Sequence, residues 1–273
     1  MRSVICSTLV SAVLLPALVA CQDNGQTGQN ASNWSATLRE EAQQRADSLL
    51  KILEAAGDWK QVIVVADSLG SEGSISSVKC NLLVATAYAN IGELRTSEFF
   101  FKKIVDGPIP EDEDFGLYCE SAASFSGLLV NKRDYGTALQ VALPVVNAME
   151  KHTDYSPTVQ AILLESIGRS QLSLGRDREA ADSYDRAFRI YQQEAAADST
   201  ANGVRHVVVN AYNTALGYLT AKCFPEAMTW TLRADSAMNV YKGISDANTA
   251  FVDNAGARLH LLHAVALQGL GQE

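Results

Sequence analysis

The sequence lacks the short motifs on which enzyme sites are commonly built. It contains no G-x-S-x-G, H-E-x-x-H or G-x-G-x-x-G segment and no Walker loop, so the usual nucleophilic, zinc-hydrolase and nucleotide-binding sites have no candidate. It also lacks a dense basic stripe, and its net charge is −9, with 22 Lys and Arg against 31 Asp and Glu. Nucleic-acid binding depends largely on such basic surfaces. We therefore expect neither an enzyme nor a nucleic-acid-binding protein, and no cofactor.

Metal-ligand spacing is missing as well. The best candidates are His260 and His263, which lie three residues apart and could share one face of a helix. No acidic residue or cysteine falls beside them at ligand spacing, so we expect no metal site.

Cysteine is scarce, with five in 273 residues. Cys6 and Cys21 belong to the N-terminal segment described below, which leaves Cys80, Cys119 and Cys223 for the folded part. None of the three lies in a C-x-x-C pair, and an odd number in an exported protein leaves at least one free thiol. Three packed free thiols are one interpretation, and a disulfide between Cys80 and Cys119 is the other.

Long apolar runs are confined to the N-terminus. Val4 to Ala20 is almost wholly apolar but is interrupted by Pro16, and it is short for a membrane-spanning helix. It is typical of a signal-peptide core, and an ordinary secretory signal or an uncleaved anchor are the alternatives. The residues Leu18-Val19-Ala20-Cys21 resemble a bacterial lipobox. That resemblance implies cleavage before Cys21 and a lipid anchor on its thiol.

These features divide the chain into three parts. We expect a lipoprotein signal peptide over residues 1–20 and a flexible polar linker over 21–34, which is too poor in apolar residues to fold. A helical domain is expected over 35–273. The composition of that part suits helices, because the chain has only six prolines and 7% aromatic residues against 47% hydrophobic residues.

A helix, a turn and a second helix are indicated most clearly between Ile167 and Ala187. Small residues fall at Gly168, Ala180 and Ala187, an aromatic at Tyr184, and a helix-breaking Gly175 separates the two halves. This pattern resembles the tetratricopeptide (TPR) repeat, in which small residues mark the closest approach of two antiparallel helices. The resemblance implies an all-α, superhelical solenoid of antiparallel helix pairs.

Equivalent turns can be placed along the whole domain. The expected turn positions, separated by 41, 42, 47 and 49 residues, are Gly92, Arg133, Gly175, Lys222 and Gly271. They predict about five to six repeats with longer spacing than the standard 34 residues. The last turn would lead into a further second helix, so we expect that the natural protein continues beyond Glu273 or ends in a capping helix.

The resemblance also implies a partner-binding groove, which the first helix of each TPR pair lines. Aligning the turns places a mixed polar set in that groove: Lys79, Asn90, Glu120, Asn131, Glu165, Arg169, Tyr212 and Arg258. Such residues suit an extended peptide. The carboxylate clamp of chaperone-binding TPR proteins is not expected, because Leu82 and Gly127 occupy positions that would need lysine and asparagine.

Three functions remain open from the sequence. The first is a lipid-anchored TPR scaffold that binds a protein or peptide in the bacterial cell envelope, on the periplasmic side or at the outer membrane. The second is the envelope-side sensor region of a longer two-component or regulatory receptor, since Arg45-Ala46-Asp47-Ser48-Leu49 resembles Bacteroidetes-type arrays. The third is a glycan-binding lipoprotein similar to SusD.

Overall fold

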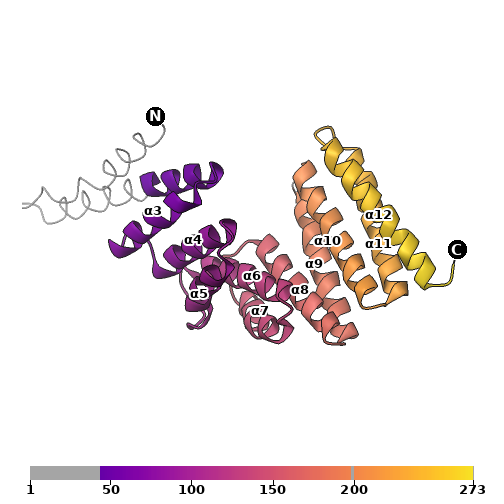
Figure 1. The fold of residues 1–273 in the computed structure, drawn as a ribbon, viewed down its shortest axis with the longest axis horizontal. Coiled ribbons are helices and arrows are strands. Elements are labelled where there is room, and N and C mark those ends of the chain that lie inside the picture. Colours follow the sequence, from indigo (N-terminus) through magenta and orange to yellow (C-terminus); the bar gives the residue numbers. More distant parts are fainter. Residues whose placement is uncertain (1–43, 198–199, 273) are drawn as a thin grey trace, which may run out of the picture. The chain divides into compact units, whose positions relative to one another are not determined.

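The protein is all-helical in the part that the computed structural model describes, residues 44–197 and 200–272. Residues 44–55 are helical, and ten further helices follow (Figure 1): α3 Trp59–Ser71, α4 Ser77–Asn90, α5 Leu94–Val105, α6 Phe115–Asn131, α7 Tyr135–Met149, α8 Pro157–Ser173, α9 Asp177–Ala197, α10 Ala201–Thr220, α11 Phe224–Lys242 and α12 Thr249–Gly269. The all-α prediction is therefore confirmed. Cys21, the expected linker and the expected start of the helical domain at residue 35 lie outside the described residues.

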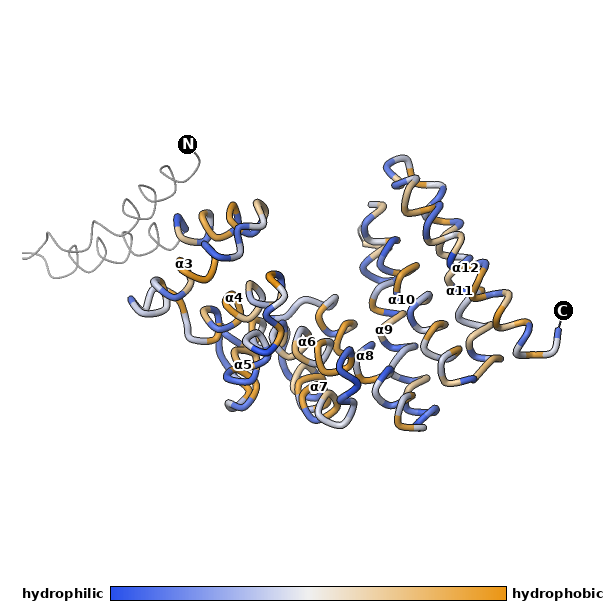
Figure 2. The backbone as a smooth tube through the Cα atoms, viewed as in Figure 1, coloured by the Kyte–Doolittle hydropathy of each residue, from blue (hydrophilic) through white to orange (hydrophobic). Residues whose placement is uncertain are grey.

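The helices form two compact units, which divide between Asp106 and Gly107. In the first unit, Leu50 and Leu53 of the helix over 44–55 share a buried cluster with Val62 of α3. In addition, α3 contacts α4, and α4 contacts α5. Figure 2 shows hydrophobic and hydrophilic residues interspersed along these helices, and each of α3, α4 and α5 buries some of its residues against a neighbour.

The second unit contains α6 to α12. Helices joined by short turns pack in pairs: α6 with α7, α8 with α9, and α10 with α11. The first helices of successive pairs also touch one another: α6 contacts α8, α8 contacts α10, and α10 contacts α12. Figure 1 shows α10, α11 and α12 side by side at the C-terminal end of this unit.

One turn geometry recurs after the helix over 44–55 and after α4, α6, α8, α10 and α12. In each case a residue with positive φ follows the helix: Gly57, Gly92, Arg133, Gly175, Lys222 and Gly271. The next backbone N–H donates to the carbonyl five residues earlier, as from Glu93 to Tyr88 at 2.9 Å and from Gln272 to Leu267 at 3.0 Å. This is the Schellman arrangement, which satisfies carbonyls at a helix end. All five turn positions expected from the spacing have this geometry.

Side-chain caps begin several of the helices. Asp58, Ser76 and Asp134 accept hydrogen bonds from the backbone N–H three residues later, at the starts of α3, α4 and α7. These caps satisfy donors that have no partner within a helix. Pro157 and Pro225 lie in the first turns of α8 and α11, where a missing N–H costs nothing.

Small residues mark the contact between α8 and α9, as the sequence predicts. Ala180 and Ala187 are completely buried, and Tyr184 is buried between them along the same helix. Gly168 of α8 faces the Tyr184 ring directly. The absence of side-chain bulk at these positions therefore allows the two helices of the pair to approach closely.

The three cysteines in the described residues are all free thiols, so the disulfide between Cys80 and Cys119 that the sequence left open is not formed. Cys80 Sγ donates instead to the carbonyl of Ala66 at 3.4 Å. Cys119 is completely buried, and burial raises the pKa of its thiol to about 12. Its thiol is therefore protonated at neutral pH and acts as a small packing group.

Candidate ligand-binding cleft

A cleft of about 470 Å³ lies between α10 and α12. Its floor is apolar and includes Val208 and Leu259, both of which are almost fully buried. Its polar lining consists of six residues from α10, α12 and the N-terminal cap of α12: Arg205, Tyr212, Asn213, Asn248, Asn254 and Arg258. The volume lies in the range of about 300–1,000 Å³ that is typical of ligand sites.

Helical periodicity explains why α10 presents these side chains together. Arg205 and Tyr212 are seven residues apart, which is close to two helical turns, so they lie on one face. Val208 lies between them along that face and contributes to the floor. On α12, Phe251 and Arg258 have the same separation. Arg205 and Tyr212 therefore line the cleft from α10, and Phe251 and Arg258 line it from α12.

The end of the cleft near the start of α12 is rigidly built. The Arg205 guanidinium lies over the Phe251 ring, 4.9 Å from its centroid, and the Phe251 ring meets the Tyr241 ring edge-to-face at 5.1 Å. Asn248 Oδ1 accepts from the Phe251 N–H at 2.9 Å, and the Asn248 N–H donates to the Tyr241 hydroxyl at 3.0 Å. The Asn248 side chain is thus fixed through its oxygen, which leaves its NH₂ group as a donor.

The electrostatics of the cleft oppose those of the whole chain. Arg205 and Arg258 are the only charged residues that line it, and no carboxylate does so among the described residues. Both arginines are exposed, and neither takes part in a salt bridge within residues 44–197 and 200–272. A protein of net charge −9 therefore carries a local cationic site that is rich in hydrogen-bond donors.

A second polar group connects α8, α9 and α10. Asn210 Nδ2 and the Tyr191 hydroxyl both donate to the carboxylate of Glu165, the latter at 3.5 Å. Burial raises the pKa of Glu165, although the two hydrogen bonds act in the opposite direction. Asn210 is buried, and its Oδ1 has no hydrogen-bond partner within the described residues. Glu165 therefore links three helices and is not simply a free groove side chain.

Another cavity, of about 490 Å³, lies among α7, α8 and α9. Its lining carries both signs of charge, with Arg178 and Arg186 beside Glu179 and Asp182. Ser183 Oγ donates to Gln171 Oε1 at 2.8 Å within it. The mixture of charges gives this cavity no clear preference for an anion or a cation.

The structure brings together only part of the predicted groove set. Tyr212 and Arg258 line the cleft between α10 and α12. Glu165 joins the polar group just described, and Arg169 is exposed one turn further along α8. Glu120 is exposed on α6, and Asn131 is the last residue of that helix. These four residues line neither cavity.

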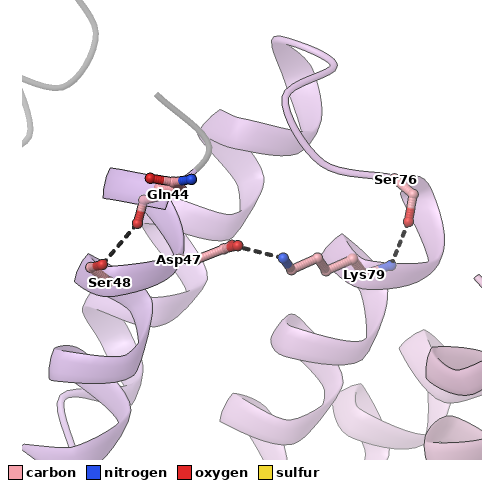
Figure 3. Close-up of polar contacts among 5 residues, drawn as sticks. All are labelled: Gln44, Asp47, Ser48, Ser76 and Lys79. Carbon is pink, nitrogen blue, oxygen red and sulfur yellow. Dashed lines mark hydrogen bonds and ion pairs between the residues drawn. The ribbon is translucent and has the colours of Figure 1, made fainter. Parts of the chain in front are cut away.

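The two predicted groove residues of the first unit have partners within their own unit. Lys79 Nζ lies 2.7 Å from Asp47 Oδ1, and Figure 3 shows this side chain spanning from α4 to the helix over 44–55. Asn90 Nδ2 donates to the carbonyl of Thr86 in its own helix. Both side chains thus make contacts within their own unit.

Arg205, Asn248 and Phe251 were not predicted as site residues. Arg205 could have been predicted from the sequence, because it precedes Tyr212 by about two helical turns and so lies on the same face of the helix. The capping role of Asn248 could also have been predicted, since asparagine is common at the position before a helix start. The packing of Phe251 against Arg205 has no such signal, because it depends on how α12 lies against α10.

Comparison of the sequence with protein-family models finds no matching family, and comparison with curated proteins finds no matching relative. No described helix combines the length and apolar character needed to cross a membrane. Within residues 44–197 and 200–272, no three His, Cys, Asp or Glu side chains are grouped as metal ligands would be. Function has to be inferred from the geometry of the cleft and the helix pairs.

Proposed function

We propose that the protein is a TPR-type solenoid scaffold of about five to six repeats that binds a protein or peptide partner through its first helices. The observation that carries this proposal is the cleft, in which Tyr212 of α10 and Arg258 of α12 line a common hollow. Its apolar floor and donor-rich rim suit an extended segment, since backbone carbonyls can accept from its asparagines while a side chain packs below.

The recurring turns support the repeat part of the proposal. The same Schellman geometry follows each first helix in the described residues, and first helices of neighbouring pairs touch in the second unit. Stacked pairs of this kind bury a shared core and leave one face of the first helices for a ligand. These features are similar to those of TPR proteins.

Photo-crosslinking tests the binding face. Photoreactive benzoylphenylalanine in place of Tyr212 should give a discrete crosslinked product with a partner in cells. The same residue in place of Val240, which is 59% exposed on α11, should give none. Equal crosslinking at both positions, or none at position 212, would count against a partner in this cleft.

The proposal places the scaffold at the bacterial cell envelope through a lipid on Cys21, which lies outside the described residues. The lipobox-like residues before Cys21 support it. Cys21→Ala should move the protein from the membrane fraction to the soluble fraction, because the anchor would be lost. Retention of the variant in the membrane fraction would refute lipid anchoring without affecting the cleft.

A further inference from the structure

We propose that the cleft between α10 and α12 selects acidic peptides, by binding a peptide carboxylate through Arg205 and Arg258 while a neighbouring apolar side chain packs on Phe251 and Val209. This inference rests on the proposed function, because it specifies the chemistry of the peptide partner. The carboxylate can belong to an aspartate, a glutamate or a C-terminus, and these sources share one chemistry.

Charge is the first argument. The only charged side chains that line the cleft are two arginines, and neither is neutralised by an acidic neighbour within the described residues. Guanidinium groups present paired N–H donors that match the two oxygens of a carboxylate. A basic peptide would meet repulsion here, and a neutral one would leave the arginines without a charged partner.

Preorganisation is the second argument. The Arg205 guanidinium lies over the Phe251 ring, and a cation–π contact of this kind uses none of the guanidinium N–H donors in a hydrogen bond. Phe251 is held in turn by Tyr241 and by the Asn248 cap. Less side-chain freedom is lost on binding when a donor is already oriented, so the geometry favours affinity.

The lining also argues against a simple inorganic anion. Val209, which is 37% exposed, and the half-buried Phe251 would remain uncovered beneath a phosphate ion, whereas an apolar peptide side chain would bury them. Asn213 and Asn254 add amide groups that can pair with a peptide backbone. The occupant that uses the whole cleft is therefore a peptide with an acidic group beside an apolar residue.

Fluorescence polarisation with short labelled peptide pools tests the inference. The pools share randomised apolar positions and differ at one central residue, which is Glu, Gln or Lys, and each is made with a free and an amidated C-terminus. The Glu pools should bind the full-length protein about tenfold more tightly than the amidated Gln pool, and the amidated Lys pool should bind least. Tighter binding of the free than of the amidated Gln pool would identify a C-terminal carboxylate as a ligand.

Arg205→Gln and Arg258→Gln should each weaken binding of the Glu pools by about tenfold. Arg189→Gln is the matched control, because Arg189 is exposed on α9 outside the cleft and its replacement removes the same charge. Circular dichroism should show that all three variants remain folded. Added salt should weaken binding of the Glu pools, and added phosphate at equal ionic strength should weaken it no further.

Equal affinity for the amidated Glu and Gln pools, with no effect of a free C-terminus, would overturn the inference. So would an Arg258→Gln variant that binds as well as Arg189→Gln, specific displacement by phosphate, or a preference for neutral oligosaccharides at the same residues. If crosslinking at position 212 persists in any of these cases, the partner-binding proposal stands and only the acidic preference fails. Absence of both peptide binding and crosslinking would remove both.

Discussion

Gly168 of α8 lies so close to Tyr184 of α9 that a Cβ at position 168 would come within 3.0 Å of the ring atoms Cδ1 and Cε1. The ring has little room to move, because it is 3% exposed and packs near Tyr218 and Trp230. Gly168→Ala should therefore lower the free energy of unfolding by about 1–3 kcal/mol, since overpacking outweighs a gain of about 1 kcal/mol in helix propensity. Urea denaturation measures this change.

Gly127→Ala is the matched control for that substitution. Gly127 also lies inside a helix, α6, but a Cβ added there meets nothing within 4 Å. Only the propensity effect remains, so the variant should be more stable by about 0.5–1 kcal/mol. Stabilisation by both substitutions would show that the Tyr184 ring yields easily and that the close approach is not a constraint.

Lys222 adopts a φ of 61° in the turn after α10, a conformation that costs a residue with a Cβ roughly 1 kcal/mol. Lys222→Gly should remove this cost and raise the free energy of unfolding by up to about 1 kcal/mol. Ala221→Gly is the control, because Ala221 has an ordinary helical φ of −78°. That variant should lose about 0.5–1 kcal/mol, and thermal or urea unfolding would reveal opposite signs at adjacent positions.

The turns were predictable because their signals are local. Gly92, Gly175 and Gly271 are glycines after apolar helical segments, and their spacing indicated that Arg133 and Lys222 occupy the same position without being glycine. A Schellman turn depends on backbone hydrogen bonds within six residues. A short stretch of sequence therefore contains most of the information needed.

The cleft was predictable only in part. Tyr212 and Arg258 follow from counting residues back from the turns, and Arg205 could have been added from its two-turn spacing. The contact of Arg205 with Phe251 depends on the packing of α10 against α12, which the periodicity of either helix alone does not specify. The contact of Lys79 could not be predicted for the same reason, because its partner Asp47 lies 32 residues earlier in the chain, on another helix.

The ion pair between Lys79 and Asp47 should contribute little to stability despite its 2.7 Å separation. The two side chains are 28% and 37% exposed, so water and salt screen their attraction. A double-mutant cycle with Lys79→Met and Asp47→Asn should give a coupling free energy below about 1 kcal/mol, and less in high salt. A larger, salt-insensitive coupling would show that the pair is effectively buried.

Glu165 should make the stability of the protein depend on pH. Burial raises the pKa of its carboxyl above the ordinary value, so the folded protein binds this proton more tightly than the unfolded chain does. The resulting stabilisation is present in acid and is lost as the pH rises through the folded-state pKa. Glu165→Gln is neutral throughout, so its stability relative to the wild type should increase with pH across that window.

The amide in Glu165→Gln can also keep the local hydrogen bonds. Its oxygen can accept from Asn210 Nδ2, and its NH₂ can donate to the Tyr191 hydroxyl oxygen, which reverses the direction of that bond. Urea unfolding between mildly acidic and neutral pH should therefore show a variant at least as stable as the wild type at neutral pH. The Glu179→Gln substitution serves as the control, because it removes one carboxylate from an exposed position on α9. A constant difference between Glu165→Gln and the wild type at every pH would mean that Glu165 ionises equally easily in the folded and unfolded chains.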